Sequence, residues 1–375
     1  MSTDGRLARL RERMAEQDLA GFFVSAPAED ISRTLGANRR YLSGFSGSMG
    51  HLFITADKQY IAVDFRYYDQ AEREAPNFTL FHSNGGMATW LPELIGEGNL
   101  GGKKLGFESH GVTFGTYRAL RSAIETLPET DRPYLTPVDS LVESLRAIKD
   151  DAEIEAIGKA VALGDAAFEH VAAQIKPGWT ETQVAWEIEK YARENGAIAL
   201  SFPTIVGAGP WGAMPHAQPR EGHVIKEGDG VVIDMGVNLD GYMSDLTRTI
   251  VVGKPDDTFK KIYDIVLAAQ LTAEELIRSG MTGGEAHMIA ARVIEEAGYG
   301  DNFGHGLGHG VGLQVHETPR LGRTSEDVLK DGMVLTVEPG IYLTEWGGVR
   351  IEDMGYLKDG KYVNFTKAPK LQFTG

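Results

Sequence analysis

Two aspartates lie inside stretches whose composition is typical of buried β-strands. Asp234 stands in the apolar run 231–237, and Asp245 stands in the next run, 241–247. A carboxylate in a dry strand costs several kcal/mol unless it pairs with a cation or binds a metal ion. Both aspartates are therefore candidate metal ligands. The alternative is one exposed aspartate and one ordinary hydrogen bond.

The turn between the two runs decides how these aspartates face each other. The intervening residues, Asn-Leu-Asp-Gly, are typical of a tight turn. A turn centred at 239–240 places Asp234 opposite Asp245, whereas a turn centred at 240–241 places Asp245 opposite Gly236. Either register leaves both carboxylates on one face of the hairpin, because side chains alternate along a strand.

A glycine-rich segment further along the chain carries His305, His309 and His316. His305 and His309 are four residues apart, a spacing that on a helix would suggest zinc. Every second residue from 304 to 312 is glycine, however, which disfavours a helix and favours an extended segment that a ligand can approach closely. A single histidine is more often structural, but three so close together favour a functional site.

Two more carboxylates occur near the C-terminus. Glu338 ends the apolar strand-like run 334–337, and Glu352 lies two residues after Arg350. Residues two apart on a strand share a face, so an ordinary Arg350–Glu352 ion pair is the alternative to a role in a functional site.

Together, one domain offers four carboxylates and one histidine as ligands. Five ligands are too many for one open catalytic ion but suit two ions that share carboxylates. An oxygen-rich set with a single imidazole favours Mn²⁺, with Co²⁺ or Zn²⁺ also acceptable. Such a pair of ions activates water near neutral pH, so the predicted chemistry is metal-assisted hydrolysis.

The elements that position these residues divide the chain into two domains, as a length of 375 residues suggests. Residues 1–147 alternate helix and strand and predict a smaller α/β domain, with a hairpin formed by 51–54 and 59–63. Residues 148–375 predict an α+β domain. Its helices are expected from 150 to about 175 and over 181–194, 258–278 and 284–297, and strands and glycine-rich loops fill the remainder.

Composition excludes several other classes of protein. The 37 Lys and Arg against 53 Asp and Glu give a net charge of −16, which disfavours nucleic-acid binding. The longest apolar runs fall far short of the ~20 residues that a membrane-spanning helix needs. The chain has no cysteine and therefore no thiolate metal site or catalytic thiol. The charged N-terminus has no signal-peptide pattern, so we expect a cytoplasmic protein.

Five short motifs give the chain a resemblance to a known family. They are Asp-Met-Gly-Val at Asp234, Ser-Asp-Leu-Thr-Arg-Thr around Asp245, His-Gly-Leu-Gly-His-Gly-Val-Gly around His309, Val-Glu-Pro-Gly at Glu338 and Gly-Val-Arg-Ile-Glu-Asp at Glu352. Their order resembles the pita-bread metallopeptidases, the creatinase and methionine aminopeptidase-like family, over about residues 148–370. The resemblance implies that Asp234, Asp245, His309, Glu338 and Glu352 bind two metal ions. It also implies a pita-bread catalytic domain behind a creatinase-like, ribonuclease H-like N-terminal domain.

The resemblance also implies roles for residues around the metal ligands. His216 matches a histidine that contacts the substrate near the scissile bond. His305 and His316 match histidines that line a proline pocket and steady the tetrahedral intermediate. Arg350 matches an arginine beside the last ligand, and Glu338 doubles as the proton shuttle. Tyr342 is a further candidate for the same hydrogen-bond network.

The N-terminal domain discriminates within the family. Methionine aminopeptidases lack a domain of this size, and creatinase lacks the metal-ligand set. The segments 40–48 and 64–71 look like Xaa-Pro aminopeptidase (aminopeptidase P) sequences. We therefore expect an Xaa-Pro aminopeptidase that acts on short peptides with proline in the second position. The family resemblance further implies a homodimer in which the first domain caps a neighbouring site.

Two alternatives remain open. An Xaa-Pro dipeptidase (prolidase) would also have to hold the carboxylate of its substrate, for which Arg39, Arg40, Arg66 or Arg350 are candidates. A non-catalytic peptide-binding module on the same fold is the remote alternative, because such relatives typically lose metal ligands and none is lost here.

Overall fold

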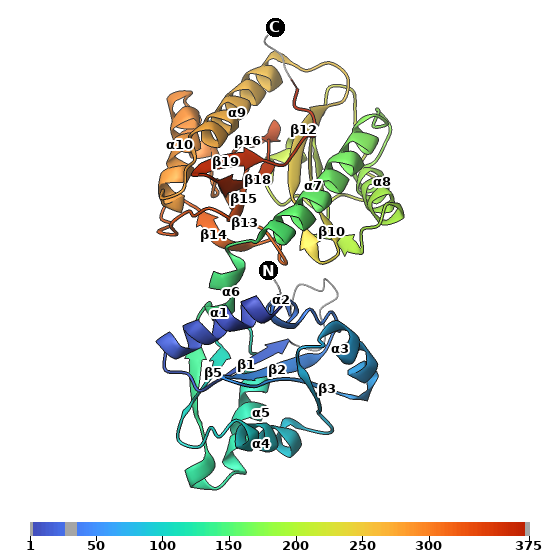
Figure 1. Cartoon of the computed structure of the whole chain (residues 1–375). Coiled ribbons are helices and arrows are strands. Elements are labelled where there is room, and N and C mark those ends of the chain that lie inside the picture. Colours follow the sequence, from blue (N-terminus) through green and yellow to red (C-terminus); the bar gives the residue numbers. More distant parts are fainter. Residues whose placement is uncertain (1–2, 27–35, 372–375) are drawn as a thin grey trace. The chain divides into compact units, whose positions relative to one another are not determined.

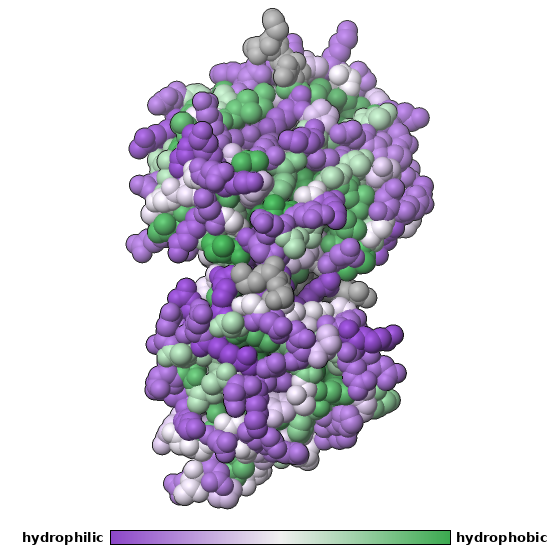
Figure 2. All heavy atoms as spheres, in the orientation of Figure 1, coloured by the Kyte–Doolittle hydropathy of each residue, from purple (hydrophilic) through white to green (hydrophobic). Residues whose placement is uncertain are grey.

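The computed structural model describes residues 3–26 and 36–371. The chain forms two compact units, Met1–Arg146 and Ala147–Gly375, each with its own hydrophobic core (Figure 1). Hydrophilic residues cover much of the visible face of each unit (Figure 2). Among the described residues, no helix is both long enough and apolar enough to cross a membrane.

The N-terminal unit is a six-stranded mixed sheet with helices on both sides (Figure 1). Its strand order is β4-β3-β2-β1-β5-β6, and β2 pairs with β3 as the predicted hairpin, with Ile54 opposite Gln59. The strands are β1 (Gly21–Ala26), β2 (Gly50–Thr55), β3 (Gln59–Val63), β4 (Thr79–His82), β5 (Lys104–Glu108) and β6 (Tyr134–Val138). The helices are α1 (Thr3–Glu16), α2 (Ala37–Ser43), α3 (Tyr68–Glu74), α4 (Met87–Glu97), α5 (Phe114–Glu125) and α6 (Leu141–Arg146).

The C-terminal unit has two helix pairs, α7 with α8 and α9 with α10, packed against several small antiparallel sheets. The helices are α7 (Asp151–Ala172), α8 (Glu181–Glu194), α9 (Asp257–Leu276) and α10 (Gly283–Glu296). Capping boxes begin α7, α8 and α10, because Asp150, Thr180 and Thr282 each exchange hydrogen bonds with the residue three positions later. The predicted α7 ended near Ile175, but the helix ends one turn earlier, before Pro177 and the left-handed Gly178.

Thirteen short strands complete this unit over its described residues, 147–371. Those before α9 are β7 (Ala199–Leu200), β8 (Ile205–Ala208), β9 (Gly230–Met235), β10 (Val237–Leu239), β11 (Tyr242–Met243) and β12 (Leu246–Val251). Those after α10 are β13 (Gly308–Gly310), β14 (Glu317–Leu321), β15 (Val334–Val337), β16 (Gly340–Leu343), β17 (Gly347–Arg350), β18 (Asp353–Lys358) and β19 (Lys361–Asn364). The α/β unit followed by an α+β unit confirms the predicted fold class.

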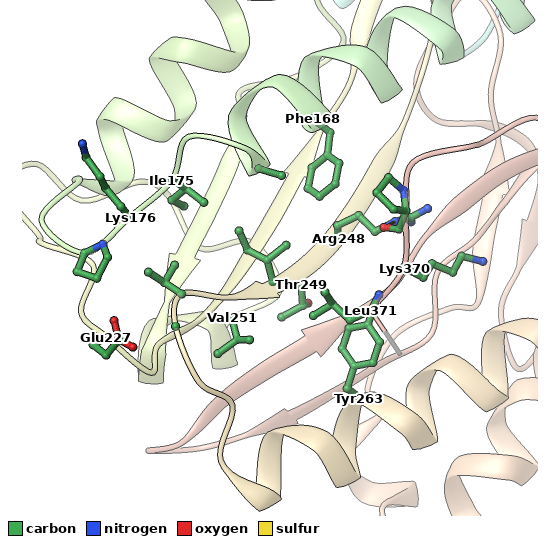
Figure 3. A pocket seen from close by; sticks show the side chains of 16 residues that line it. Phe168, Ile175, Lys176, Glu227, Arg248, Thr249, Val251, Tyr263, Lys370 and Leu371 are labelled. Carbon is green, nitrogen blue, oxygen red and sulfur yellow. Dashed lines mark hydrogen bonds between the residues drawn. The ribbon is translucent and has the colours of Figure 1, made fainter. Parts of the chain in front are cut away.

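A largely apolar pocket of about 400 Å³ lies beside β12 and the last described residues, 369–371 (Figure 3). Phe168 of α7 and Tyr263 of α9 line it together with Arg248. The guanidinium of Arg248 is buried and pairs with Asp353 at 2.7 Å, so this arginine is part of the core and not a free cation in the pocket.

Candidate active site

The hairpin that carries the two aspartates adopts the second of the two predicted registers. Asp234 pairs with Thr247, and Leu239 pairs with Tyr242. The turn residues Asp240 and Gly241 both have positive φ, at 49° and 87°, as a type I′ hairpin turn requires. Asp234 on β9 and Asp245, just before β12, nevertheless line the same pocket.

Nine of the residues singled out in the sequence line one pocket of about 420 Å³. These residues are Asp234, Asp245, His216, His305, His309, His316, Glu338, Arg350 and Glu352. Glu338 directly follows β15, and Glu352 lies between β17 and β18. The pair β9–β12 brings the two aspartates together, and the pair β15–β18 brings the two glutamates together. A hydrogen bond of 3.0 Å from the Glu352 N–H to the Thr247 carbonyl oxygen joins the two pairs, so carboxylates up to 118 residues apart in sequence meet.

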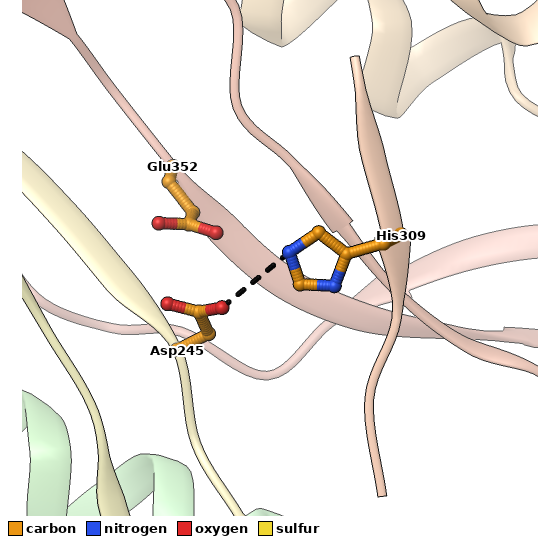
Figure 4. Close-up of side chains that lie close together, drawn as sticks. All are labelled: Asp245, His309 and Glu352. Carbon is orange, nitrogen blue, oxygen red and sulfur yellow. Dashed lines mark ion pairs between the residues drawn. The ribbon is translucent and has the colours of Figure 1, made fainter. Parts of the chain in front are cut away.

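Asp245, His309 and Glu352 each offer one ligand atom, and these atoms all lie within 4.8 Å of one another. Figure 4 shows the His309 ring directed at the Asp245 carboxylate, with Glu352 beside it. His309 Nε2 lies 3.6 Å from Asp245 Oδ2 and 3.3 Å from Glu338 Oε1. One nitrogen atom therefore faces two carboxylates at once.

The neighbours of His309 explain its tautomer and its flanking glycines. Its Nδ1 lies 3.1 Å from the Gly310 carbonyl oxygen, which can only accept, so Nδ1 carries the proton and Nε2 has a free lone pair. A Cβ at Gly308 would collide with the Thr336 carbonyl oxygen, and one at Gly310 would collide with the Thr318 carbonyl group. Glycine on both sides lets the histidine strand lie close to its neighbours.

Without a cation, burial and mutual repulsion disfavour the ionised form of the carboxylates in this cluster. Burial, followed by the charges of Glu352 and Asp234, raises the pKa of Asp245 well above its usual range. Burial, followed by Glu338 and Asp234, does the same to the pKa of Glu352. Burial also raises the pKa of Glu338 to about 7, although Arg350 opposes the shift. Like charges gathered in a buried site are typical of a metal centre.

One carboxylate oxygen of this cluster accepts no hydrogen bond from the described residues. Asp234 Oδ2 accepts a hydrogen bond from Arg350 at 2.6 Å, but Asp234 Oδ1 is buried and meets no donor among the described residues. A buried acceptor left unsatisfied costs about 1–3 kcal/mol. The donor set and this oxygen therefore fit divalent cations.

Threonine hydroxyl groups hold the two glutamates of the cluster. Thr247 donates to Glu352 Oε2 at 2.7 Å, and Thr336 donates to Glu338 Oε1 at 3.2 Å. The sequence analysis did not single out either threonine. Each stands two residues from a predicted ligand, Asp245 or Glu338, and this shared strand face was the signal that could have found them.

Arg350 is the centre of the surrounding hydrogen-bond network. Besides Asp234, its guanidinium donates to Thr247 Oγ1 at 3.0 Å, to the Pro215 carbonyl oxygen at 3.2 Å and to Tyr342 Oη at 2.7 Å. It is 3% exposed, so these protein contacts fully enclose it. An ordinary Arg350–Glu352 ion pair, the alternative considered from sequence, is not formed among the described residues.

Two of the remaining histidines are neutral. Burial, with a smaller contribution from Arg350, lowers the pKa of His305 to about 4. Its Nδ1 donates to the Gly306 carbonyl at 2.8 Å, so Nε2 accepts from Tyr342 Oη at 3.0 Å, which places Tyr342 in the network. Burial, followed by His309, also lowers the pKa of His316 to about 4, and its ring meets that of His309 edge-on at 4.4 Å.

Both parts of the chain match known protein families. Residues 155–359 match the model for metallopeptidase family M24, and residues 6–148 match the creatinase/prolidase N-terminal domain. A curated Xaa-Pro dipeptidase of Pyrococcus horikoshii is 39% identical over 317 residues, which cover 84% of this chain and 86% of that protein.

Solved structures agree with this family match. An Xaa-Pro dipeptidase from Bacillus anthracis has a TM-score of 0.90 and 38% identity, with 99% of each chain covered. An X-Pro aminopeptidase from Thermotoga maritima has a TM-score of 0.86 and 32% identity, with 97% of this chain and 98% of that chain covered. These matches show that the chain belongs to metallopeptidase family M24, with a creatinase/prolidase N-terminal domain.

Proposed function

We propose that this protein is an Xaa-Pro dipeptidase that hydrolyses the bond between an N-terminal residue and a following proline. The observation that carries the proposal is the convergence of four carboxylates and His309 on one pocket, with a buried Asp234 oxygen that no protein donor reaches. The sequence favoured the aminopeptidase. The named relatives support the dipeptidase at least as well, since the Bacillus anthracis and Pyrococcus horikoshii proteins carry that name.

The five converging side chains are proposed to hold two divalent ions, for which Mn²⁺ suits the oxygen-rich set and Co²⁺ or Zn²⁺ are alternatives. When bound, the ions polarise the scissile carbonyl group and make water nucleophilic near neutral pH. Arg350 fixes Asp234 by a charged hydrogen bond, and the threonines fix the two glutamates. The protein's own hydrogen bonds thus orient the ligand carboxylates in the absence of metal ions.

Proton transfer is assigned to Glu338. Burial raises its pKa to about 7 in the metal-free protein, although Arg350 opposes the shift. A carboxyl group near neutrality can take a proton from the attacking water and return it to the departing proline nitrogen. Metal binding lowers that pKa, so Glu338 is expected to be ionised in the loaded protein when the reaction begins.

The histidines are proposed to contact the substrate. His216 is exposed in the pocket and donates to the scissile carbonyl oxygen as charge develops on it. His305 has both ring nitrogens engaged with protein atoms, so it forms a wall of the proline pocket. His316 and the apolar residues Phe202, Pro203 and Ile205 complete that wall. A pocket of this kind suits a pyrrolidine ring, whose nitrogen carries no hydrogen.

An Xaa-Pro aminopeptidase is the second candidate, and one observation favours it. Arg350 is the one arginine or lysine that lines the pocket among the described residues, and protein partners already occupy its guanidinium. Of the other candidate arginines, Arg39 donates to the Gly50 carbonyl and Arg66 pairs with Asp64 at 2.7 Å. A substrate carboxylate would therefore need His316 or a group outside this pocket.

The experiment that decides between the two compares Ala-Pro with Ala-Pro-Ala. Metal-free protein is reloaded separately with Mn²⁺, Co²⁺ and Zn²⁺, and release of alanine is measured for both peptides. The dipeptidase cleaves Ala-Pro and leaves the tripeptide intact. Cleavage of Ala-Pro-Ala at a similar or higher rate would assign the aminopeptidase instead.

A homodimer, on the family resemblance, and a cytoplasmic location are also proposed. Light scattering on the purified chain tests the first, and fractionation of cells that express it tests the second. A monomeric mass at micromolar concentration would contradict the dimer.

A further inference from the structure

His216 lies on a loop, and the His216 side chain does not help to fix that loop in place. Residues 209–220, which we call the His216 loop, leave the end of β8, and both His216 and Gln218 in it line the active-site pocket. The His216 side chain is exposed, and no hydrogen bond joins it to another residue in the described part of the chain. The position of its ring therefore depends on how the loop is fixed.

Both ends of the His216 loop converge on one buried carboxylate. Glu181 is 0% exposed, and its Oε1 accepts from the backbone N–H of Ala208 at 3.0 Å, immediately before the loop. Its Oε2 accepts from the backbone N–H of Arg220 at 2.8 Å, at the end of the loop. A single side chain thus closes the loop at its base.

The side chain of Arg220 completes this closure, because it forms a bidentate ion pair with Glu181. Its Nε donates to Glu181 Oε2 at 3.0 Å, and one terminal nitrogen donates to Glu181 Oε1 at 2.7 Å. Fork-to-fork pairs of this kind fix geometry more strictly than a lysine could. Glu181 is the first residue of α8, where the helix dipole favours a negative charge.

The same arginine also reaches into the loop. Its guanidinium stacks over the ring of Trp211 at 4.6 Å, and Trp211 Nε1 donates to the carbonyl oxygen of Gln218 at 2.9 Å. On the other side, Arg350 donates to the Pro215 carbonyl oxygen at 3.2 Å. His216 thus lies between two held backbone carbonyls, that of Pro215, fixed by Arg350 from outside the loop, and that of Gln218, fixed by Trp211 of the loop itself.

From these contacts we infer that Glu181 and Arg220 form a positioning pair for the reaction, which holds the His216 loop so that the His216 ring reaches the scissile bond. The four hydrogen bonds that Glu181 accepts from the described residues come from the two ends of this loop, so the pair does not serve to join helices. By contrast, the Arg193–Glu189 pair of α8 is exposed and joins two residues of the same helix. The inference rests on the proposed role of His216.

Arg220→Lys is the informative variant, because it keeps the positive charge but loses the bidentate hydrogen bonding to Glu181 and the stacking on Trp211. We expect it to lower kcat on the order of 10-fold, since small misplacements of a catalytic group are costly. Bound metal per chain should stay at the wild-type value, because Arg220 touches no carboxylate of the metal cluster. Glu189→Gln, which removes a half-buried carboxylate from the same helix, is the matched control and should leave kcat unchanged.

A double-mutant cycle separates positioning from general stability. The four proteins are wild type, Arg220→Lys, His216→Ala and the double variant, each loaded with Mn²⁺ and assayed on Ala-Pro. If Arg220 acts through His216, the double variant has the kcat of His216→Ala alone. If the two losses multiply in the double variant, the pair acts on general stability and the inference is overturned.

Hydrogen exchange of residues 209–220 keeps the inference testable if the proposed role of His216 fails. Full activity of His216→Ala would remove that role, but Arg220→Lys should still speed exchange of this segment relative to wild type and to Glu189→Gln. Unchanged exchange in Arg220→Lys would overturn the positioning pair, whatever His216 does.

Discussion

Arg350 donates a hydrogen bond of 2.6 Å to Oδ2 of Asp234, while Oδ1 of the same carboxylate is buried without a hydrogen-bond donor among the described residues. The arginine thus fixes one oxygen of Asp234 and leaves the other for a cation. Tyr342 extends this link, because it accepts from Arg350 and donates to His305. One network therefore connects a proposed metal ligand to the proposed wall of the proline pocket.

Removing a ligand charge should remove the metal. Asp234→Asn and Glu352→Gln each replace an ionised ligand by a neutral amide of the same size, and we expect both to abolish activity and lower bound metal per chain. Metal analysis and an Ala-Pro assay measure the two effects on the same sample. Full activity in either variant would exclude this cluster as the catalytic site.

The histidines should separate into two classes. His216→Ala should keep both ions and lower kcat on the order of 10²-fold, the usual size of one lost transition-state hydrogen bond. His309→Ala should lose metal together with activity, because its Nε2 faces Asp245 and Glu338. The measurement is bound metal beside single-turnover kinetics for both variants. Metal loss in His216→Ala with retention in His309→Ala would mean that the roles are reversed.

The metal-free protein should become less stable as the pH rises. Burial raises the pKa of Glu338 in the folded state to about 7, against about 4.3 in the unfolded chain. Between these values the unfolded state releases the proton and the folded state keeps it, so the free energy of unfolding falls across about pH 4–7 and then levels off. Asp245 and Glu352, whose pKa values are also raised, add to this loss.

Thermal unfolding of metal-free protein from pH 5 to pH 8 tests this dependence. Saturating Mn²⁺ should raise Tm most at the upper end of the range, because the cations neutralise the ionised cluster. A metal-free Tm that rises from pH 5 to pH 7 would contradict the electrostatic account. The Glu352→Gln variant is the matched control and should show a smaller pH dependence.

The buried pair of Arg248 and Asp353 should be important for stability. Burial opposes ionisation of Asp353, but Arg248 and Lys370 outweigh it and lower the pKa of Asp353 to about 2. Arg248→Met leaves that carboxylate buried without its main partner and should lower the free energy of unfolding by about 3–5 kcal/mol. Urea denaturation measures the free energy of unfolding. The control is Arg193→Met, which breaks the exposed ion pair of Arg193 with Glu189. Equal stability of the two variants would refute this role.

The sequence predicts the fold class well, because it depends on local patterns, and nine residues that it singled out for a site lie around one pocket. Alternation and capping residues mark α5, where the Thr113 hydroxyl accepts a hydrogen bond from the backbone N–H of Thr116. Helix α4 escaped prediction because Pro92 interrupts its pattern. The register of the β9–β12 hairpin stayed open, since the same turn residues permit two arrangements and only the backbone angles of Asp240 decide.

Contacts between distant segments could not be predicted from one sequence. The hydrogen bond from Thr247 to Glu352 joins residues 105 positions apart, and the one from Arg350 to Pro215 joins residues 135 apart. Glu181 looks like an ordinary first-turn helix residue, and its contact with Arg220 appears only once β8 lies beside α8. Such pairs depend on packing and not on local propensity.

The central claim is a metal-dependent preference for proline as the leaving residue, and one comparison tests it most directly. The values of kcat/KM for Ala-Pro and Ala-Ala are measured with the Mn²⁺-loaded protein, and again after metal removal. We predict that Ala-Pro exceeds Ala-Ala by at least about tenfold, or roughly 1.4 kcal/mol, and that both rates vanish without metal. Equal rates for the two peptides, or hydrolysis that persists after metal removal, would contradict the account.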